Sequence, residues 1–294
     1  MLAIFLPSSA EAARVMVATI FPAAQIARQV TAGRDGVTIE TLLPADTGCP
    51  HDYAPTPQEI RQLEHADVII RIGLGLDDFP GMKRLTQPIL SLGDLLPPSD
   101  LLPMDVHHHK EHANSDHQTH SAINPHVFSS PRLMGQMATL LAEELAKIDP
   151  EGSALYRRNA LVWKKKMDDL AECFYELGQH LRKQPFAAQY SVFDYLLRDA
   201  ALSPSITIHA HAGHEPSAGA LLSVAREMKS RSITWLLLEP AYLSRMGRLL
   251  KQETGASIIP LETGVSSRSS ADPDAYEQLM RRNLKLLEQS FAKH

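Results

Sequence analysis

Histidine is the residue whose number and grouping first point to chemistry in this sequence. Fourteen of the 294 residues are histidine, and most of them fall in two clusters, over residues 106–120 and 208–216. Neutral imidazole nitrogens are common ligands of transition metals, Zn²⁺ in particular. We therefore start from the hypothesis that the protein binds a transition metal.

The first cluster lies in a segment rich in proline and histidine, over residues 94–125, that has no helix or strand periodicity and is expected to be a loop. Its imidazoles are His107, His108, His109, His112, His117 and His120. Such a segment can bind metal weakly and adaptively. Ordering a mobile loop costs conformational entropy, so we expect it to collect or sense metal rather than to form the main site. The alternative is a solvated loop with no part in binding.

Two other histidines stand alone in proline-rich segments. His51 lies in Gly-Cys-Pro-His-Asp-Tyr-Ala-Pro-Thr-Pro, and His126 lies in Asn-Pro-His-Val-Phe-Ser-Ser-Pro. A lone loop histidine is usually only solvated, so neither residue predicts a function by itself. Whether either histidine can be assigned a function depends on the sequence motif around it.

The elements that must position these residues alternate between strands and helices. Short apolar, β-branched runs predict strands over 15–20, 37–43, 67–72, 88–92, 186–189, 205–209, 233–238 and 258–262. Helical patterns separate them, which favours an α/β fold with mainly parallel sheets. A helical pattern over about 152–183 is too long for an ordinary crossover and divides the chain into halves.

These patterns predict two α/β lobes, each a mainly parallel sheet flanked by helices, joined by one long connecting helix. We place the N-terminal lobe at 14–148 with the histidine-rich loop at 105–122, the connecting helix at 149–184, and the C-terminal lobe at 185–294. In such sheets ligands bind beyond the carboxyl ends of the strands. His51 directly follows a predicted strand, and the second histidine cluster covers the end of another.

Six short motifs occur in an order that resembles a known family. They are Pro50–Tyr53, Gly73–Asp77, Asn124–His126, Glu215–Ser217, Leu238–Pro240 and Glu253–Ala256. Together they resemble the periplasmic metal-binding receptors of bacterial zinc and manganese ABC transporters, solute-binding protein family 9. The resemblance covers nearly the whole chain from about Val15. Each motif is weak alone, but their order and the long helix make the resemblance specific.

The resemblance implies a metal held between the lobes by three histidines and a carboxylate. Carried over by motif, His51 is the first ligand, His126 the second, and Glu262 the carboxylate, where the family usually has aspartate. Three imidazoles and one carboxylate suit four-coordinate Zn²⁺, with Mn²⁺ as the less favoured metal. As an alternative, Glu262 only caps the turn after its strand.

The family's third histidine is missing. The matching motif places Tyr190 at that position, with Gln189 as the neighbouring candidate, and a phenol or an amide is a poor ligand for Zn²⁺. We expect His209, His211 or His214 to replace it, with His214 favoured because it lies deepest in its loop. Alternatively these three form a surface cluster and water completes the site.

The resulting hypothesis is an extracytoplasmic receptor that captures Zn²⁺ and delivers it to an ABC permease, rather than an enzyme. Zinc-type members of the resembled family carry a histidine-rich loop, which favours zinc. The alternatives are a zinc-dependent hydrolase, a manganese receptor or a metal-linked adhesin. Against hydrolysis, the chain has no His-Glu-x-x-His, Gly-x-Ser-x-Gly or Walker motif.

The net charge of the chain limits its binding partners, and the sequence of its N-terminus indicates its cellular compartment. A net charge of −5 gives no electrostatic footprint for nucleic acid or anionic membranes, and no segment is apolar enough to span a bilayer. Residues 1–13 look like the end of an export signal, with the small-x-small site Ala10-Glu11-Ala12, but lack a basic region. A truncated signal, or an unstructured start, is expected there. We expect a periplasmic monomer.

Overall fold

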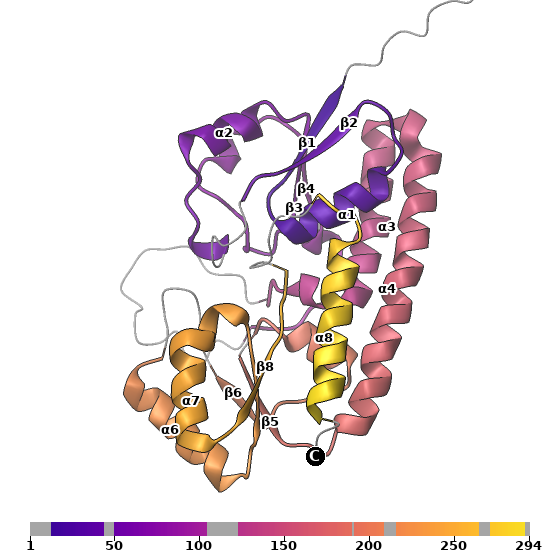
Figure 1. Cartoon of the computed structure of the whole chain (residues 1–294). Helices are drawn as coiled ribbons and strands as arrows, with labels where there is room; N and C mark the ends of the chain where they lie inside the picture. Colours follow the sequence, from indigo (N-terminus) through magenta and orange to yellow (C-terminus); the bar gives the residue numbers. More distant parts are fainter. Residues whose placement is uncertain are drawn as a thin grey trace, which may run out of the picture.

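A computed structural model describes residues 13–43, 50–104, 123–189, 191–208, 216–264 and 271–291. Within them the chain forms two four-stranded parallel sheets with helices around them. The sheets lie one beyond the other, and a long helix, α4 (Ser153–Leu181), runs beside both (Figure 1). The predicted fold class, two α/β lobes with a long helix, is therefore confirmed.

The N-terminal sheet has the strand order β2-β1-β3-β4. Its strands are β1 (Arg14–Ala18), β2 (Val37–Thr41), β3 (Val68–Arg71) and β4 (Ile89–Ser91). The inner strands are apolar on both faces because helices cover the sheet. Helix α1 (Phe21–Thr31) follows β1, and α2 (Pro57–Glu64) follows β2.

The C-terminal sheet repeats this arrangement with the order β6-β5-β7-β8. Its strands are β5 (Phe186–Gln189), β6 (Ile206–Ile208), β7 (Trp235–Leu238) and β8 (Ser257–Pro260). The flanking helices are α5 (Asp194–Asp199), α6 (Ala218–Ser230) and α7 (Arg248–Thr254), the last preceded by a π-helical turn at Leu243–Gly247.

Three helices join the lobes. Helix α3 (Pro131–Ile148) packs along α4, and α8 (Ala275–Phe291) returns from the C-terminal sheet to pack against α4 and α1 (Figure 1). The buried Tyr276 of α8 donates a hydrogen bond to the carbonyl of Phe128 at 2.8 Å. Gln25 of α1 receives the backbone N–H of Tyr276 at 3.1 Å and donates to the carbonyl of Asp272 at 3.0 Å. The last helix is thus part of the packing of the first lobe.

The lower end of α4 meets the C-terminal lobe closely at Gly178. A Cβ at this position would lie 1.7 Å from the carbonyl oxygen of Ala200, just after α5. Only glycine allows the helix and that carbonyl to approach in this way. The contact fixes α5 against α4.

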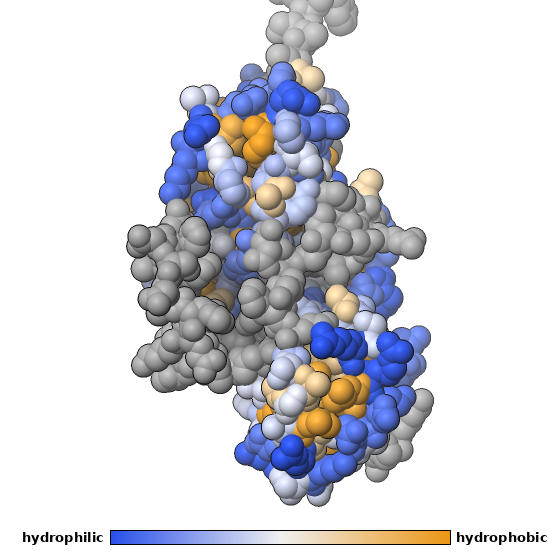
Figure 2. Space-filling view, turned by 90° about the vertical axis from the view of Figure 1, so that its left-hand side faces the viewer, coloured by the Kyte–Doolittle hydropathy of each residue, from blue (hydrophilic) through white to orange (hydrophobic). Residues whose placement is uncertain are grey.

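The surface of both lobes is mostly hydrophilic on the face shown in Figure 2, with apolar residues gathered in one area on each lobe. Large exposed apolar side chains of the described residues include Leu161 and Val162 on α4. None of the helices in the described ranges is long and apolar enough to cross a membrane.

Candidate metal centre

His126 is held in a buried position where the chain enters α3. It directly precedes the 3-10 turn Val127–Ser129, and it is 8% exposed. Its ring packs edge-on against the ring of Phe128, with the centroids 5.8 Å apart. The ring atom Nδ1 lies 2.8 Å from Oδ1 of Asn124. Packing and hydrogen bonding therefore fix the direction of this imidazole.

His51 lies in the short 3-10 turn Pro50–Asp52, between β2 and α2, and is exposed. The residues that follow anchor the turn to the lobe. Tyr53 packs on Phe79, with ring centroids 5.9 Å apart, and donates a hydrogen bond to Glu59 at 2.6 Å. Burial and the Glu59 carboxylate raise the pKa of Tyr53 to about 12, so it stays a neutral donor. Thr56 and Glu59 form a capping box that starts α2.

The structure brings these two histidines together. The ring centroids of His51 and His126 are 6.0 Å apart, with the ring planes at 69°. Two imidazoles bound to one tetrahedral zinc, with Zn–N distances of about 2.0–2.1 Å, would have centroids about 5 Å apart. The observed separation is about 1 Å longer than this distance. Residues from two separate loops form this pair.

Glu262 lies just beyond β8, and its side chain is half-buried. Its backbone is held by Asn283 of α8, a residue 1% exposed. The Asn283 amide donates to the carbonyl of Glu262 at 2.6 Å and accepts its N–H at 3.0 Å. This clamp of two hydrogen bonds fixes the position of the backbone from which the Glu262 side chain extends. The role of Asn283 was not foreseen, since an asparagine in a helical pattern carries no signal for a distant contact.

A polar chain that the sequence also did not reveal crosses the carboxyl ends of β5, β7 and β8. Gln189 accepts the backbone N–H of Glu239 at 3.1 Å, and Thr263 donates to the Glu239 carboxylate at 2.5 Å. Burial raises the pKa of Glu239, although the hydrogen bonds from Thr263 and Gln189 oppose this effect. Gln189, 3% exposed, thus braces neighbouring strands.

The remaining predicted ligands lie outside the described residues. They are Tyr190, His209, His211, His214 and the loop histidines His107, His108, His109, His112, His117 and His120. Among the residues that the structure does describe, no three His, Cys, Asp or Glu side chains lie close enough to hold a metal ion together. The complete ligand set therefore stays a prediction.

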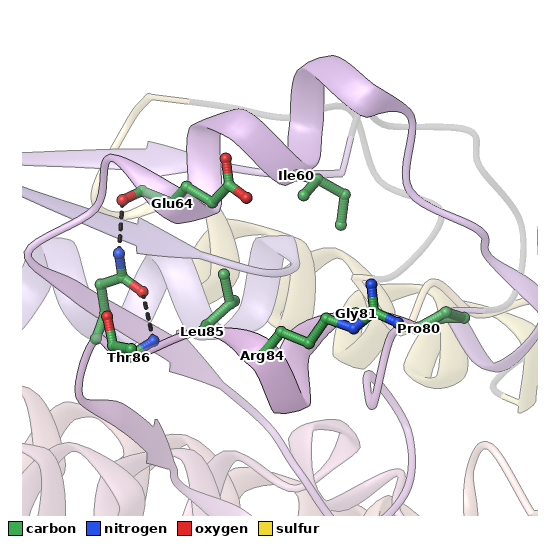
Figure 3. Close-up of a pocket in the computed structure, with 8 residues that line it drawn as sticks. Ile60, Glu64, Pro80, Gly81, Arg84, Leu85 and Thr86 are labelled. Atoms are coloured by element: carbon green, nitrogen blue, oxygen red, sulfur yellow. Dashed lines mark hydrogen bonds between the residues drawn. The ribbon is translucent and has the colours of Figure 1, made fainter.

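A pocket of about 320 Å³ lies on the N-terminal lobe, near α2 and the turn Met82–Arg84 (Figure 3). Ile60, Leu85 and Pro80 give it apolar walls, and Glu64 and Arg84 lie at it. Gln87 closes one side by donating to the carbonyl of Glu64 at 2.5 Å. None of the predicted metal ligands lines this pocket, so it is separate from the histidine pair.

The two lobes, the long helix and the paired imidazoles are the features predicted for a metal-binding solute receptor. Residues 16–290 match the family described as zinc-uptake complex component A, periplasmic, and the chain belongs to this family. The predictions of a zinc-uptake receptor, of Zn²⁺ as its metal and of a protein that is not an enzyme are therefore confirmed. Such receptors work outside the cytoplasm with an ABC transporter permease.

Known proteins with similar sequences carry names that agree with this family. The high-affinity zinc uptake system protein ZnuA of Bacillus subtilis is 24% identical over 279 residues, which are 94% of this chain and 86% of that protein. The zinc-binding protein AdcA of Streptococcus pyogenes is 24% identical over 287 residues. That match covers 92% of this chain but only 55% of AdcA, so the chain spans about half the length of that relative.

A solved structure of the same fold is that of a mutant of the laminin-binding adhesin Lmb from Streptococcus agalactiae. It matches with a TM-score of 0.76 at 20% identity, over 93% of this chain and 98% of the other. At this identity the match shows the fold alone. The family match, and not the fold, therefore separates the zinc receptor from the adhesin alternative.

Proposed function

We propose that this receptor captures Zn²⁺ between its lobes with His51 and His126 from the N-terminal lobe and Glu262 from the C-terminal lobe. The observation that carries the proposal is the 6.0 Å separation of the two histidine rings. One carboxylate from the opposite lobe would offset part of the ion's charge. A set dominated by imidazole favours Zn²⁺ over Mn²⁺.

The strand register supports a third ligand from the loop after β6. Strands β5 and β6 are parallel, and Gln189 pairs with Ile208. The ends of these two strands therefore lie side by side, and the next residues in sequence are Tyr190, which matches the family's ligand position, and His209. This proximity of the two strand ends supports a replacement imidazole from residues 209–214. We propose His214 first, and His211 or His209 as the alternatives.

Alanine substitution of each ligand tests the site. In a competition assay with a zinc chelator, the variants His51→Ala and His126→Ala should weaken zinc binding about 100-fold or more, and Glu262→Gln should weaken it less. His180 of α4, a histidine outside the site, gives the matched control His180→Ala, which should bind zinc as the unmodified chain does. Unchanged affinity in both His51→Ala and His126→Ala would overturn the proposed site.

The same assay assigns the third ligand. Among Tyr190→Phe, His209→Ala, His211→Ala and His214→Ala, one histidine variant should weaken zinc binding and Tyr190→Phe should not. If none of the three histidine variants weakens binding, the replacement of the lost imidazole by this loop is wrong.

Zinc binding should also depend steeply on pH, because the imidazoles must lose their protons to coordinate. With ordinary histidine pKa values near 6.5, affinity should fall progressively as the pH is lowered from 7.5 to 5. Titration calorimetry over this range measures the effect. Constant affinity would contradict coordination by histidine.

We further propose that the histidine-rich loop assists capture without forming the tight site. Deletion of residues 107–120 should leave one tightly bound zinc per chain, and loss of that zinc would show that the loop is the principal site. We propose a monomer with lobes at 14–148 and 185–294 joined through 149–184. Export with cleavage near Ala13 would be seen by mass spectrometry of the periplasmic fraction.

A further inference from the structure

The side chain of Asn124 can be oriented from its surroundings alone. Its Nδ2 donates to the backbone carbonyl of Ser191 at 2.8 Å and to Oδ2 of Asp194 at 3.0 Å. A carbonyl oxygen can only accept, so the amide nitrogen must be on this side. The amide oxygen, Oδ1, therefore faces His126.

That orientation determines which nitrogen of His126 carries the proton. Asn124 Oδ1 accepts the backbone N–H of His126 at 3.0 Å and lies 2.8 Å from the ring Nδ1. An amide oxygen has no hydrogen to donate, so Nδ1 must be the donor. A neutral imidazole carries one proton, so Nε2 is the nitrogen whose lone pair would coordinate a metal.

We propose that Asn124 is a positioning residue that holds His126 in the Nδ1–H tautomer, and that Asp194 holds Asn124 in turn. This inference rests on the proposed function, because it gives His126 its role as a ligand. A ligating histidine is commonly oriented by a partner on its other nitrogen. Here the chain of contacts runs from α5 of the C-terminal lobe to a ligand of the N-terminal lobe.

The burial of the contacts makes the arrangement rigid. Asn124 is fully buried and Ser191 is 1% exposed. Tyr195 of α5 donates a hydrogen bond to the backbone carbonyl of Asn124 at 2.7 Å and accepts the N–H of Leu102 at 2.9 Å. Both the side chain and the backbone of Asn124 are thus held by the segment that follows β5.

This segment also carries the family's third ligand position. Ser191 has φ +66°, a left-handed conformation that is uncommon for residues other than glycine, and its carbonyl accepts from Asn124. Tyr190 is the residue directly before it. Asn124, which contacts the second proposed ligand, is thus hydrogen-bonded to the residue next to the family's third ligand position.

Long-range ¹⁵N correlation NMR of the histidine rings of the full chain without zinc tests the proposal. At a pH where the ring is neutral, His126 should show the Nδ1–H tautomer. Asn124→Ala should give a mixture of tautomers and weaken zinc binding about 10-fold to 100-fold, the range found when such partners are removed. A merely structural role of Asn124 would lower stability without changing the tautomer.

Two further variants sharpen the test. Asn159 also clamps two backbone carbonyls, those of Val30 and Ala32 at 3.1 and 2.8 Å, but its contacts join α4 to the end of α1. Asn159→Ala should leave the His126 tautomer and zinc affinity unchanged. Asn124→Asp keeps an acceptor for Nδ1 of His126 but places a carboxylate oxygen against the carbonyl of Ser191. It should therefore keep the Nδ1–H tautomer while lowering stability.

The outcomes separate this inference from the proposed function. An Nε2–H tautomer in the unmodified chain, or an unchanged tautomer in Asn124→Ala, would overturn the positioning role even if zinc binds at His126. Loss of the proposed function would instead appear as zinc affinity that His126→Ala does not change, whatever the tautomer.

Discussion

The clamp between Asn283 and Glu262 should contribute to both the stability of the fold and zinc binding. Asn283→Ala removes two hydrogen bonds, at 2.6 and 3.0 Å, that hold the backbone of Glu262 to α8. A hydrogen bond contributes about 1 kcal/mol net, and a buried polar group left without a partner costs about 1–3 kcal/mol. Since Glu262 is half-buried, water can satisfy part of this loss.

We therefore expect Asn283→Ala to lower the free energy of unfolding by about 2–3 kcal/mol. Thermal unfolding should show a decrease in Tm of about 4–12 °C, since about 2–4 °C corresponds to 1 kcal/mol in chains of about 150–250 residues. Zinc affinity should fall about 10-fold or more, because the backbone that carries the Glu262 carboxylate is no longer held in place.

Asn159→Ala is again the matched control, because it also removes two hydrogen bonds between a side-chain amide and the backbone. It should lower Tm by a similar or smaller amount and leave zinc affinity unchanged. The reasoning is refuted if Asn283→Ala costs less than about 0.5 kcal/mol, or if both variants change zinc affinity equally.

Two other predictions concern stability. Gly178→Ala should cost more than about 3 kcal/mol or prevent folding, since its Cβ would lie 1.7 Å from a backbone oxygen. In Gly219→Ala the atom nearest to the new Cβ would be 3.9 Å away, so this variant should be neutral or stabilising in denaturant unfolding. Equal effects of the two substitutions would contradict the steric explanation. The Arg34 guanidinium, with help from Tyr156, lowers the pKa of Asp149 to about 2, against the effect of its burial. Because the folded pKa lies below the unfolded one, this stabilisation, about 2–2.5 kcal/mol, is present above about pH 4 and lost as pH falls toward 2. The difference in stability between the unmodified chain and Asp149→Asn should shrink over that range, and a constant difference would count against the assignment.

Much of the fold could be predicted because its signals are local. The apolar run that ends at Ile20 and the motif Thr56-Pro57 mark a buried strand and a capped helix, and the structure has β1 and α2 there. The length of the helical pattern after Pro150 likewise predicts α4, observed at Ser153–Leu181. Periodicity and capping are properties of a short stretch of sequence, so one sequence is enough to read them.

The candidate site could be predicted only in part, because contacts between distant residues leave no local signal. The motifs around His51 and His126 pointed to a pair that the structure brings together. The residues that orient the predicted ligands, Asn124 and Asn283, act through contacts 70 and 21 residues away in sequence. Their roles follow from tertiary packing, which a hydrophobic pattern does not encode.

The return of α8 to the first lobe has a consequence for how the protein matures. Gln25, near the start of the chain, finds its buried partners at Asp272 and Tyr276, near the end. While the chain is being synthesised from its N-terminus, these two contacts cannot form until residues 272–276 are available. The packing of the first lobe is therefore completed only when the last helix has been made.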